Sequence, residues 1–172
     1  MSTQDDSLFE PSVKQRLDQL NIKLFADGAD INDMLESLKN PYVKGFTTNP
    51  SLMRSAGIAD YESFGRDVLK AIHQWPVSFE VFSDEPDEML QQARYIASWG
   101  NNVNIKIPVT NSRGEFMGPV IRQLSKEGVC LNITAVMTLD QVNAIADVLS
   151  DKSPAIISIF AGRIADTGID PA

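Results

Sequence analysis

Short apolar runs alternate with longer amphipathic stretches along most of this chain, and this alternation limits its fold more than any other feature. Six runs are rich in β-branched or aromatic residues and predict strands: IKLFADG, VKGFTTNP, PVSFEVFS, VNIKIPVT, VCLNITAVM and AIISIFAGR. The stretches between them have helical length and pattern: INDMLESLK, DYESFGRDVLKAIHQ, DEMLQQARYIASWG, FMGPVIRQLSKEG and TLDQVNAIADVLSD. Successive βα units of this kind form parallel sheets through right-handed crossovers.

Polar residues inside the strands distinguish an open doubly wound sheet from a (β/α)8 TIM barrel. Helices cover both faces of a doubly wound sheet, so its central strands are apolar on both faces. Here alternate positions of three consecutive strands are polar: Ser78 and Glu80, Asn104 and Lys106, Asn132 and Thr134. Such a polar face suits a barrel interior near the C-terminal mouth, so we expect an α/β TIM barrel. The neighbours are expected to point the other way: Phe79, Val81, Ile105, Ile107, Ile133 and Ala135.

The number of units predicts an incomplete barrel. A full barrel takes about 200 to 250 residues, and this chain has 172. We therefore expect about six of eight βα units, and the end IDPA, after a strand and loop without a closing helix, indicates a fragment. SVKQRLDQL predicts an extra N-terminal helix because its apolar residues have helical spacing. The expected organisation is a flexible segment over 1–12 and one partial barrel, the catalytic domain, over 13–172.

Helix boundaries are marked by capping residues. Asp60, Asp84 with Pro86, and Thr138 each precede a predicted helix. Gly100 and Gly128 stand where helices are expected to stop. The stretch ADGADINDMLE is similar to a calcium loop, but its acidic residues miss that loop's spacing, so helix capping is the preferred interpretation.

Charge and composition exclude several classes of function. The formal net charge of -8 argues against nucleic acid or an anionic membrane as partner, and leaves an anionic small molecule open. MSTQDDSLFEP is neither a secretion signal nor an anchor, so we expect a cytoplasmic protein. Cys130 and His73 are the only residues of their types, which predicts no disulfide and no zinc or transition-metal site. A homo-oligomer stays open.

The lysine in NNVNIKIPVT indicates covalent chemistry. The inward polar residues, if they share one cavity, are Asp27, Asn49, Glu80, Lys106, Asn132, Thr134 and Ser158. A desolvated lysine is partly a free amine, which attacks a carbonyl and forms a Schiff base. Carboxylates then serve the proton transfers, and amide and hydroxyl groups suit sugar hydroxyls or an ordered water. The guanidinium of Arg163 is a candidate phosphate ligand.

Each of these residues alone also has a simpler interpretation. A single lysine in a strand is usually ion-paired or extended to the surface, and an arginine such as Arg163 usually forms a surface ion pair. The combination of Lys106 with Glu80, Asp27 and Asn132 favours catalysis.

The motifs FADGAD, GFTTNPS, FEVFS, NIKIPVT, LNITAV and SIFAGRI resemble those of the transaldolases, including the small fructose-6-phosphate aldolases, in order and spacing. The resemblance runs from about Ile22 to the end, and TTNPS with IKIPVT is its most specific part. It implies a cofactor-free enzyme of the pentose phosphate pathway with sugar-phosphate partners. Such an enzyme transfers a three-carbon dihydroxyacetone unit from a ketose phosphate to an aldose phosphate through a lysine Schiff base.

The resemblance also implies residue roles. Lys106 matches the Schiff-base lysine, and Asp27 matches the acid/base group that acts on the C4 hydroxyl. Glu80 matches the glutamate that works through a catalytic water, which Thr134 helps to hold. The expected substrate-binding residues, of which the last two face the distal end and the phosphate, are Thr47, Asn49, Asn132, Ser158 and Arg163.

Two alternatives stay open: a Schiff-base aldolase that releases free dihydroxyacetone, and a non-catalytic sugar-phosphate-binding protein. Glu80 favours the transaldolase, because the resemblance implies Gln at this position in the aldolases. The family's last two strands, which include a second phosphate-binding arginine, have no counterpart in this sequence.

Overall fold

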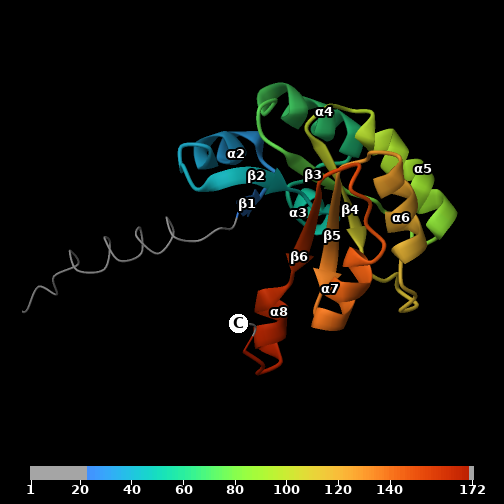
Figure 1. Ribbon diagram of the computed structural model, residues 1–172. Coiled ribbons are helices and arrows are strands. Elements are labelled where there is room, and N and C mark those ends of the chain that lie inside the picture. The colour runs from blue at the N-terminus through green and yellow to red at the C-terminus, as the bar shows by residue number, and fades with distance from the viewer. Residues whose placement is uncertain (1–22, 171–172) are drawn as a thin grey trace, which may run out of the picture.

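The computed structural model describes residues 23–170 and contains one parallel sheet with alternating helices (Figure 1). The strands are β1 (Leu24–Asp27), β2 (Val43–Thr47), β3 (Val77–Glu80), β4 (Val103–Pro108), β5 (Leu131–Val136) and β6 (Ala155–Ile159). The helices are α2 (Ile31–Ser37), α3 (Pro50–Ser55), α4 (Tyr61–Ala71), α5 (Pro86–Ala97), α6 (Gly118–Lys126), α7 (Leu139–Ala146) and α8 (Ala161–Asp166).

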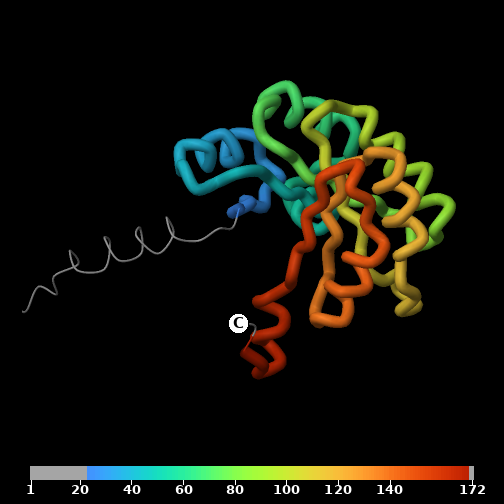
Figure 2. The backbone as a smooth tube through the Cα atoms, in the orientation of Figure 1, coloured from blue at the N-terminus to red at the C-terminus, as the bar shows by residue number. Residues whose placement is uncertain are grey.

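The strand order identifies the architecture. All six strands are parallel, and each pairs with its neighbours in the sequence, in the order β1-β2-β3-β4-β5-β6. A doubly wound sheet reverses its strand order at a switch point, and no reversal occurs within the described residues. The backbone trace shows the sheet curling into an open half-barrel (Figure 2). The predicted α/β fold, six units of a (β/α)8 barrel, is confirmed, whereas the predicted flexible segment 1–12 and leading helix lie outside the described residues.

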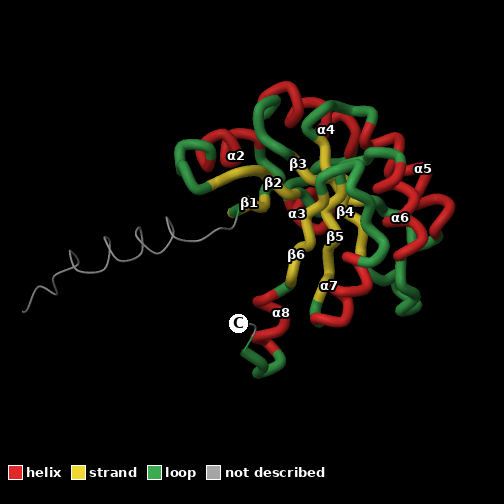
Figure 3. The backbone as a smooth tube through the Cα atoms, viewed as in Figure 1, coloured by secondary structure: helices red, strands yellow, loops and turns green. Residues whose placement is uncertain are grey.

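The apolar core lies between the sheet and the helices that cover its outer face (Figure 3). Phe79, Ile105, Ile107 and Ile133 are fully buried there, as the alternation within their strands predicted. Helices α4, α5 and α6 supply the other side with Val68, Leu69, Met89, Ala93, Ile96, Val120, Ile121 and Leu124. Because this layer is apolar, the polar alternate residues of β3, β4 and β5 are left on the inner face.

Three helix starts are capped as their sequences predict. The Asp60 side chain accepts a hydrogen bond from the Ser63 N–H at 3.0 Å, and Asp30 caps α2 in the same way. Thr138 and Gln141 form a reciprocal capping box at the start of α7. The predicted cap at Asp84 is wrong, because its carboxylate instead accepts hydrogen bonds from the N–H and hydroxyl of Ser112. This contact ties the loop after β3 to the loop after β4.

Helices α3 and α8 stand where the sequence predicted no helix. Asn49 caps α3 and Pro50 occupies its first turn. The run VKGFTTNP was interpreted as one strand, so the helix start within TTNPS was overlooked. The run AIISIFAGR is a strand only to Ile159, and its remainder turns into α8. The expected end without a closing helix is therefore wrong, and Arg163 lies on a helix.

Ala135 is the one predicted outward residue of β5 that lies on the inner side, where it lines a cavity. Its φ of +60° falls in the left-handed region, and the β5–β6 register shifts between Ile133 and Val136. A bulge of this kind re-aims a side chain, because it breaks the strict two-residue alternation.

None of the helices between residues 23 and 170 combines the length and the apolar character needed to cross a membrane.

Candidate active site

The inner face of the sheet carries a cavity of about 710 Å³ at the C-terminal ends of the strands. All nine residues that the sequence singled out line this cavity: Asp27, Thr47, Asn49, Glu80, Lys106, Asn132, Thr134, Ser158 and Arg163. The remaining lining residues are Pro50, Ser51, Pro108, Ala135 and Phe160. The structure thus brings the predicted set into one place, although their surroundings differ greatly.

Strand register places three of these residues in one row across the sheet. Glu80 of β3 pairs with Lys106 of β4, and Lys106 pairs with Asn132 of β5. Paired residues of neighbouring parallel strands project to the same face about 4.8 Å apart. The row therefore sets a carboxylate on one side of the lysine and an amide on the other.

Lys106 is nearly buried, with 8% of its surface exposed. Its Nζ donates a hydrogen bond to the carbonyl oxygen of Thr48 at 3.1 Å and lies 3.4 Å from Oε2 of Glu80. Burying an ammonium group without partners is costly, so these two oxygens explain how the folded chain holds a lysine there. The contacts leave Nζ at the cavity wall beside a carboxylate.

Asn132 is held from both sides and is 1% exposed. Its Nδ2 donates to the hydroxyl of Ser78 at 3.1 Å, and its Oδ1 accepts from the hydroxyl of Ser158 at 2.8 Å. The amide thus links β3, β5 and β6 on the inner face. Since both ends of the amide are engaged, its orientation is fixed before any ligand arrives.

Thr134 precedes the bulge in β5 and is 4% exposed. It pairs with Pro108 of β4, two residues further toward the C-terminal ends of the strands than the pair of Lys106 and Asn132. The left-handed backbone at Ala135 follows directly. Strained backbone of this kind costs energy and is found preferentially at functional sites.

The β1–β2 side of the cavity is more open. Asp27 is the exposed last residue of β1, pairs with Thr47, and forms no ion pair with any described residue. Asn49 uses its Oδ1 to accept the Leu52 N–H at 2.8 Å, as the cap of α3. Its side-chain NH2 group therefore remains for other partners.

Arg163 is the most loosely held residue of the set. It lies on α8, a helix without buried residues, and its side chain is 74% exposed. Its Nη1 is 3.5 Å from Oδ2 of Asp166, one turn along the same helix. Exposed pairs of this kind contribute little to stability, so the guanidinium is free to exchange Asp166 for another anion.

Sequence reasoning missed Thr48, Ser78 and Phe160 as parts of the site. The backbone carbonyl of Thr48 accepts a hydrogen bond from Lys106, and a backbone group cannot be identified from residue types. The hydroxyl of Ser78 accepts a hydrogen bond from the side-chain amide of Asn132. The inward alternation of β3 was the available signal for Ser78. Among the described residues, no group of three His, Cys, Asp or Glu side chains is placed to hold a metal ion.

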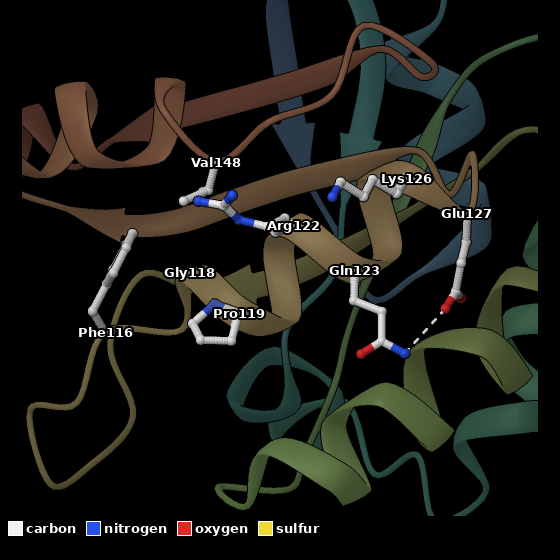
Figure 4. Close-up of a pocket in the computed structure, with 8 residues that line it drawn as sticks. All are labelled: Phe116, Gly118, Pro119, Arg122, Gln123, Lys126, Glu127 and Val148. Atoms are coloured by element: carbon white, nitrogen blue, oxygen red, sulfur yellow. Dashed lines mark hydrogen bonds between the residues drawn. The ribbon is translucent and has the colours of Figure 1, made fainter.

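A second cavity of similar size, about 690 Å³, lies on the outside of the sheet between α6 and the end of α7. Figure 4 shows Arg122 pointing toward Val148, while Gln123 hydrogen-bonds Glu127 on the other side of α6. This outer cavity is lined by Phe116, Gly118, Pro119, Arg122, Gln123, Lys126, Glu127 and Val148. The outer cavity lacks a buried nucleophile, so the inner cavity is the candidate reaction site.

Comparison with known proteins identifies relatives over most of the chain. The family model described as Transaldolase/Fructose-6-phosphate aldolase matches residues 24–171. A protein of Dehalococcoides mccartyi named "Probable transaldolase" is 39% identical over 149 residues, which are 87% of this chain and 65% of the relative. Proteins with the same name from Thermoplasma volcanium and Streptococcus agalactiae serotype V are 36% and 35% identical, with 87% of this chain covered. They are covered to 64% and 65%, so the chain spans slightly less than two thirds of these curated relatives.

Proposed function

We propose that this chain, which belongs to the transaldolase/fructose-6-phosphate aldolase family, carries the Schiff-base centre of a cytoplasmic transaldolase of the pentose phosphate pathway. The whole protein transfers a three-carbon dihydroxyacetone unit from a ketose phosphate to an aldose phosphate and needs no cofactor. The observation that carries the proposal is the nearly buried Lys106, whose Nζ lies 3.4 Å from a Glu80 carboxylate oxygen at the wall of a 710 Å³ cavity.

The first step is imine formation. Glu80 takes a proton from the Lys106 ammonium, and the resulting amine attacks the C2 carbonyl of the ketose phosphate to give a carbinolamine, which loses water to form an iminium ion. Glu80, directly or through one water, donates the proton that lets the hydroxyl depart as water. Its position beside Nζ is the geometry this step requires, because the hydroxyl that departs is carried by C2, the substrate carbon that Nζ attacks.

The second step is carbon–carbon bond cleavage. Asp27 removes the proton of the C4 hydroxyl, the C3–C4 bond breaks, and its electron pair moves into the iminium to give an enamine. The aldose phosphate leaves, and an acceptor aldehyde takes up the three-carbon unit by the reverse steps. Asp27 lines the same cavity and forms no ion pair within residues 23–170, so its carboxylate is free for this task.

Substrate binding falls to the polar groups around these three residues. The free NH2 group of Asn49 and the hydroxyl groups of Thr47 and Thr134 suit sugar hydroxyls or the catalytic water. Ser158 and Arg163 face the distal end, where the exposed guanidinium binds the phosphate in place of Asp166.

Borohydride trapping tests this function. Fructose 6-phosphate and borohydride are added together, and the product is analysed by intact mass and peptide mapping. We expect one reduced adduct on Lys106 in the native protein, none in Lys106→Ala, and an unchanged adduct in Lys44→Ala, whose lysine is exposed outside the site. An adduct that persists in Lys106→Ala, or none in the native chain, rejects the Schiff-base centre.

The fate of the trapped unit separates the alternatives. A transaldolase passes dihydroxyacetone to an added aldose phosphate and releases little of it to water, whereas an aldolase releases it freely. A non-catalytic binding protein is protected against heat by the sugar phosphate without forming an adduct.

A further inference from the structure

The end of the β2–β3 ladder leaves the backbone N–H and C=O of Glu80 without a strand partner. The last register pair of these strands is Thr47 with Ser78, and the Thr48 N–H donates to the Ser78 carbonyl at 3.0 Å. Backbone groups of residues two apart point to the same side of a strand, so the N–H and C=O of Glu80 also face β2. There the chain has already turned into α3, which begins after Asn49.

The hydroxyl group of Tyr61 occupies the missing ladder position. It accepts a hydrogen bond from the Glu80 N–H at 2.8 Å and donates one to the Glu80 carbonyl at 3.1 Å. A phenol has one hydrogen to donate and lone pairs to accept with, so one atom satisfies both backbone groups. The two bonds do for Glu80 what the next residue of a neighbouring strand would do.

Tyr61 is well held for this task. It is the first residue of α4, a helix start fixed by the Asp60 cap. Its ring packs edge-on against Phe82, Trp99 and Phe79, with centroids 4.7, 5.5 and 6.0 Å away. Burial raises the pKa of Tyr61 well above its usual range, although hydrogen bonds with Thr48 and the Glu80 backbone act in the opposite direction. The hydroxyl proton is therefore present throughout the working pH range.

We propose that Tyr61 is a positioning residue for Glu80, which deepens the proposed function and rests on it. The hydroxyl fixes the backbone of Glu80, and thereby keeps its carboxylate beside the Lys106 amine. The Thr48 carbonyl fixes the amine itself at 3.1 Å. Both partners of the proton transfer are thus anchored at the end of the same ladder. Tyr61 acts on the rate of imine formation and leaves substrate binding unchanged, because it does not line the cavity.

Tyr61→Phe is the sharpest test, because it removes one oxygen atom and keeps the ring in the aromatic cluster. The rate of formation of the trapped adduct is measured against fructose 6-phosphate concentration from pH 5 to pH 9. We expect the limiting rate to fall about tenfold, a part of the 10²–10⁴ that a positioned acid or base contributes. The half-saturating concentration stays unchanged.

Two controls separate positioning from folding. Tyr95→Phe removes a hydroxyl from the same aromatic cluster, where it donates to the exposed Glu62 at 2.6 Å, and should leave rate and pH profile unchanged. The double variant Tyr61→Phe with Glu80→Gln should be no slower than Glu80→Gln alone, since the hydroxyl acts through that carboxyl. A full additional loss in the double variant, or an unchanged rate in Tyr61→Phe, overturns the proposal.

Amide hydrogen exchange at Glu80, followed by NMR, gives a readout independent of catalysis. Exchange should accelerate at least about tenfold in Tyr61→Phe and stay unchanged in Tyr95→Phe, because only Tyr61 accepts this N–H. Unchanged exchange rejects the positioning role even if the reaction slows. If the native chain forms no adduct, the proposed function fails. The exchange rate at Glu80 still decides whether the phenol holds its backbone: acceleration in Tyr61→Phe supports that contact, and an unchanged rate rejects it.

Discussion

The central strands β3, β4 and β5 and the edge strands β1 and β6 present the same kind of inner face in very different surroundings. Lys106 and Asn132 are almost inaccessible and have neighbours on both sides. Asp27 is exposed, and β6 is exposed at both of its ends. The groups assigned to imine formation therefore lie in the rigid part, and those assigned to the C4 hydroxyl and the phosphate lie in the open part.

This difference follows from hydrogen bonding and packing together. A central strand is fixed by two ladders and by helices on its outer face, whereas an edge strand has one ladder within the described residues. Electrostatic preorganisation needs groups that do not move when charge develops, and the centre supplies them. Groups that exchange water or Asp166 for substrate need freedom, which the edges supply.

The largest effect that tests the comparison is on stability. Ile133 of β5 and Ile157 of β6 are register partners, but only Ile133 is fully buried. We expect Ile133→Ala to lower the free energy of unfolding by about 3 kcal/mol and Ile157→Ala by about 1 kcal/mol, because the buried site leaves a cavity. Urea denaturation measures both. Equal losses would show that β6 is packed as tightly as β5.

The next effect separates binding at the edge from chemistry at the centre. Arg163→Ala should raise the half-saturating concentration of fructose 6-phosphate for adduct formation about tenfold, since a charge-assisted hydrogen bond contributes about 1.5–3 kcal/mol. With dihydroxyacetone, which has no phosphate, the variant should match the native protein. Arg54→Ala, on α3 outside the cavity lining, is the control. A loss with both substrates would place Arg163 in the chemistry.

A smaller effect concerns the link between the two regions. Ser158→Ala removes the hydroxyl that donates to the buried Oδ1 of Asn132. An unsatisfied buried acceptor costs about 1 kcal/mol or somewhat more, so the free energy of unfolding should fall by that amount. Ser55→Ala, whose hydroxyl bonds the Ser51 carbonyl on an exposed helix, should change it by less than about 0.5 kcal/mol. Equal changes would mean that the amide is not held by β6.

Much of this organisation could be predicted from residue types. Strand and helix alternation located all six strands, and the polar alternation chose the barrel and its inner face. Those signals survive because burial selects residue types at every second position of a strand. The seven residues expected to share one cavity all line it, because parallel strands bring their C-terminal ends to one edge.

The contacts that fix the reacting groups could not be predicted in this way. Thr48 holds Lys106 through a backbone carbonyl, and Tyr61 holds Glu80 through backbone groups left open where β2 ends. Both contacts depend on the residue at which one strand stops relative to the next, which residue types do not encode. The helix at Arg163 was also missed. The run AIISIFAGR was interpreted as one strand, whereas β6 ends at Ile159 and α8 begins at Ala161.

The smallest effect tests the strain at the boundary of the two regions. Ala135 has a φ of +60° in the bulge between β5 and β6, and a left-handed conformation costs an L-residue about 1–2 kcal/mol. Glycine removes this cost but adds unfolded-chain entropy of about 0.4–1 kcal/mol, so Ala135→Gly should stabilise the fold by about 0.5 kcal/mol. Ala144→Gly, the same change inside α7, should instead destabilise it by about 1 kcal/mol. Thermal unfolding of the two variants should show stability changes of opposite sign if the bulge is strained. Stability changes of the same sign would mean that the surroundings of Ala135 favour the alanine.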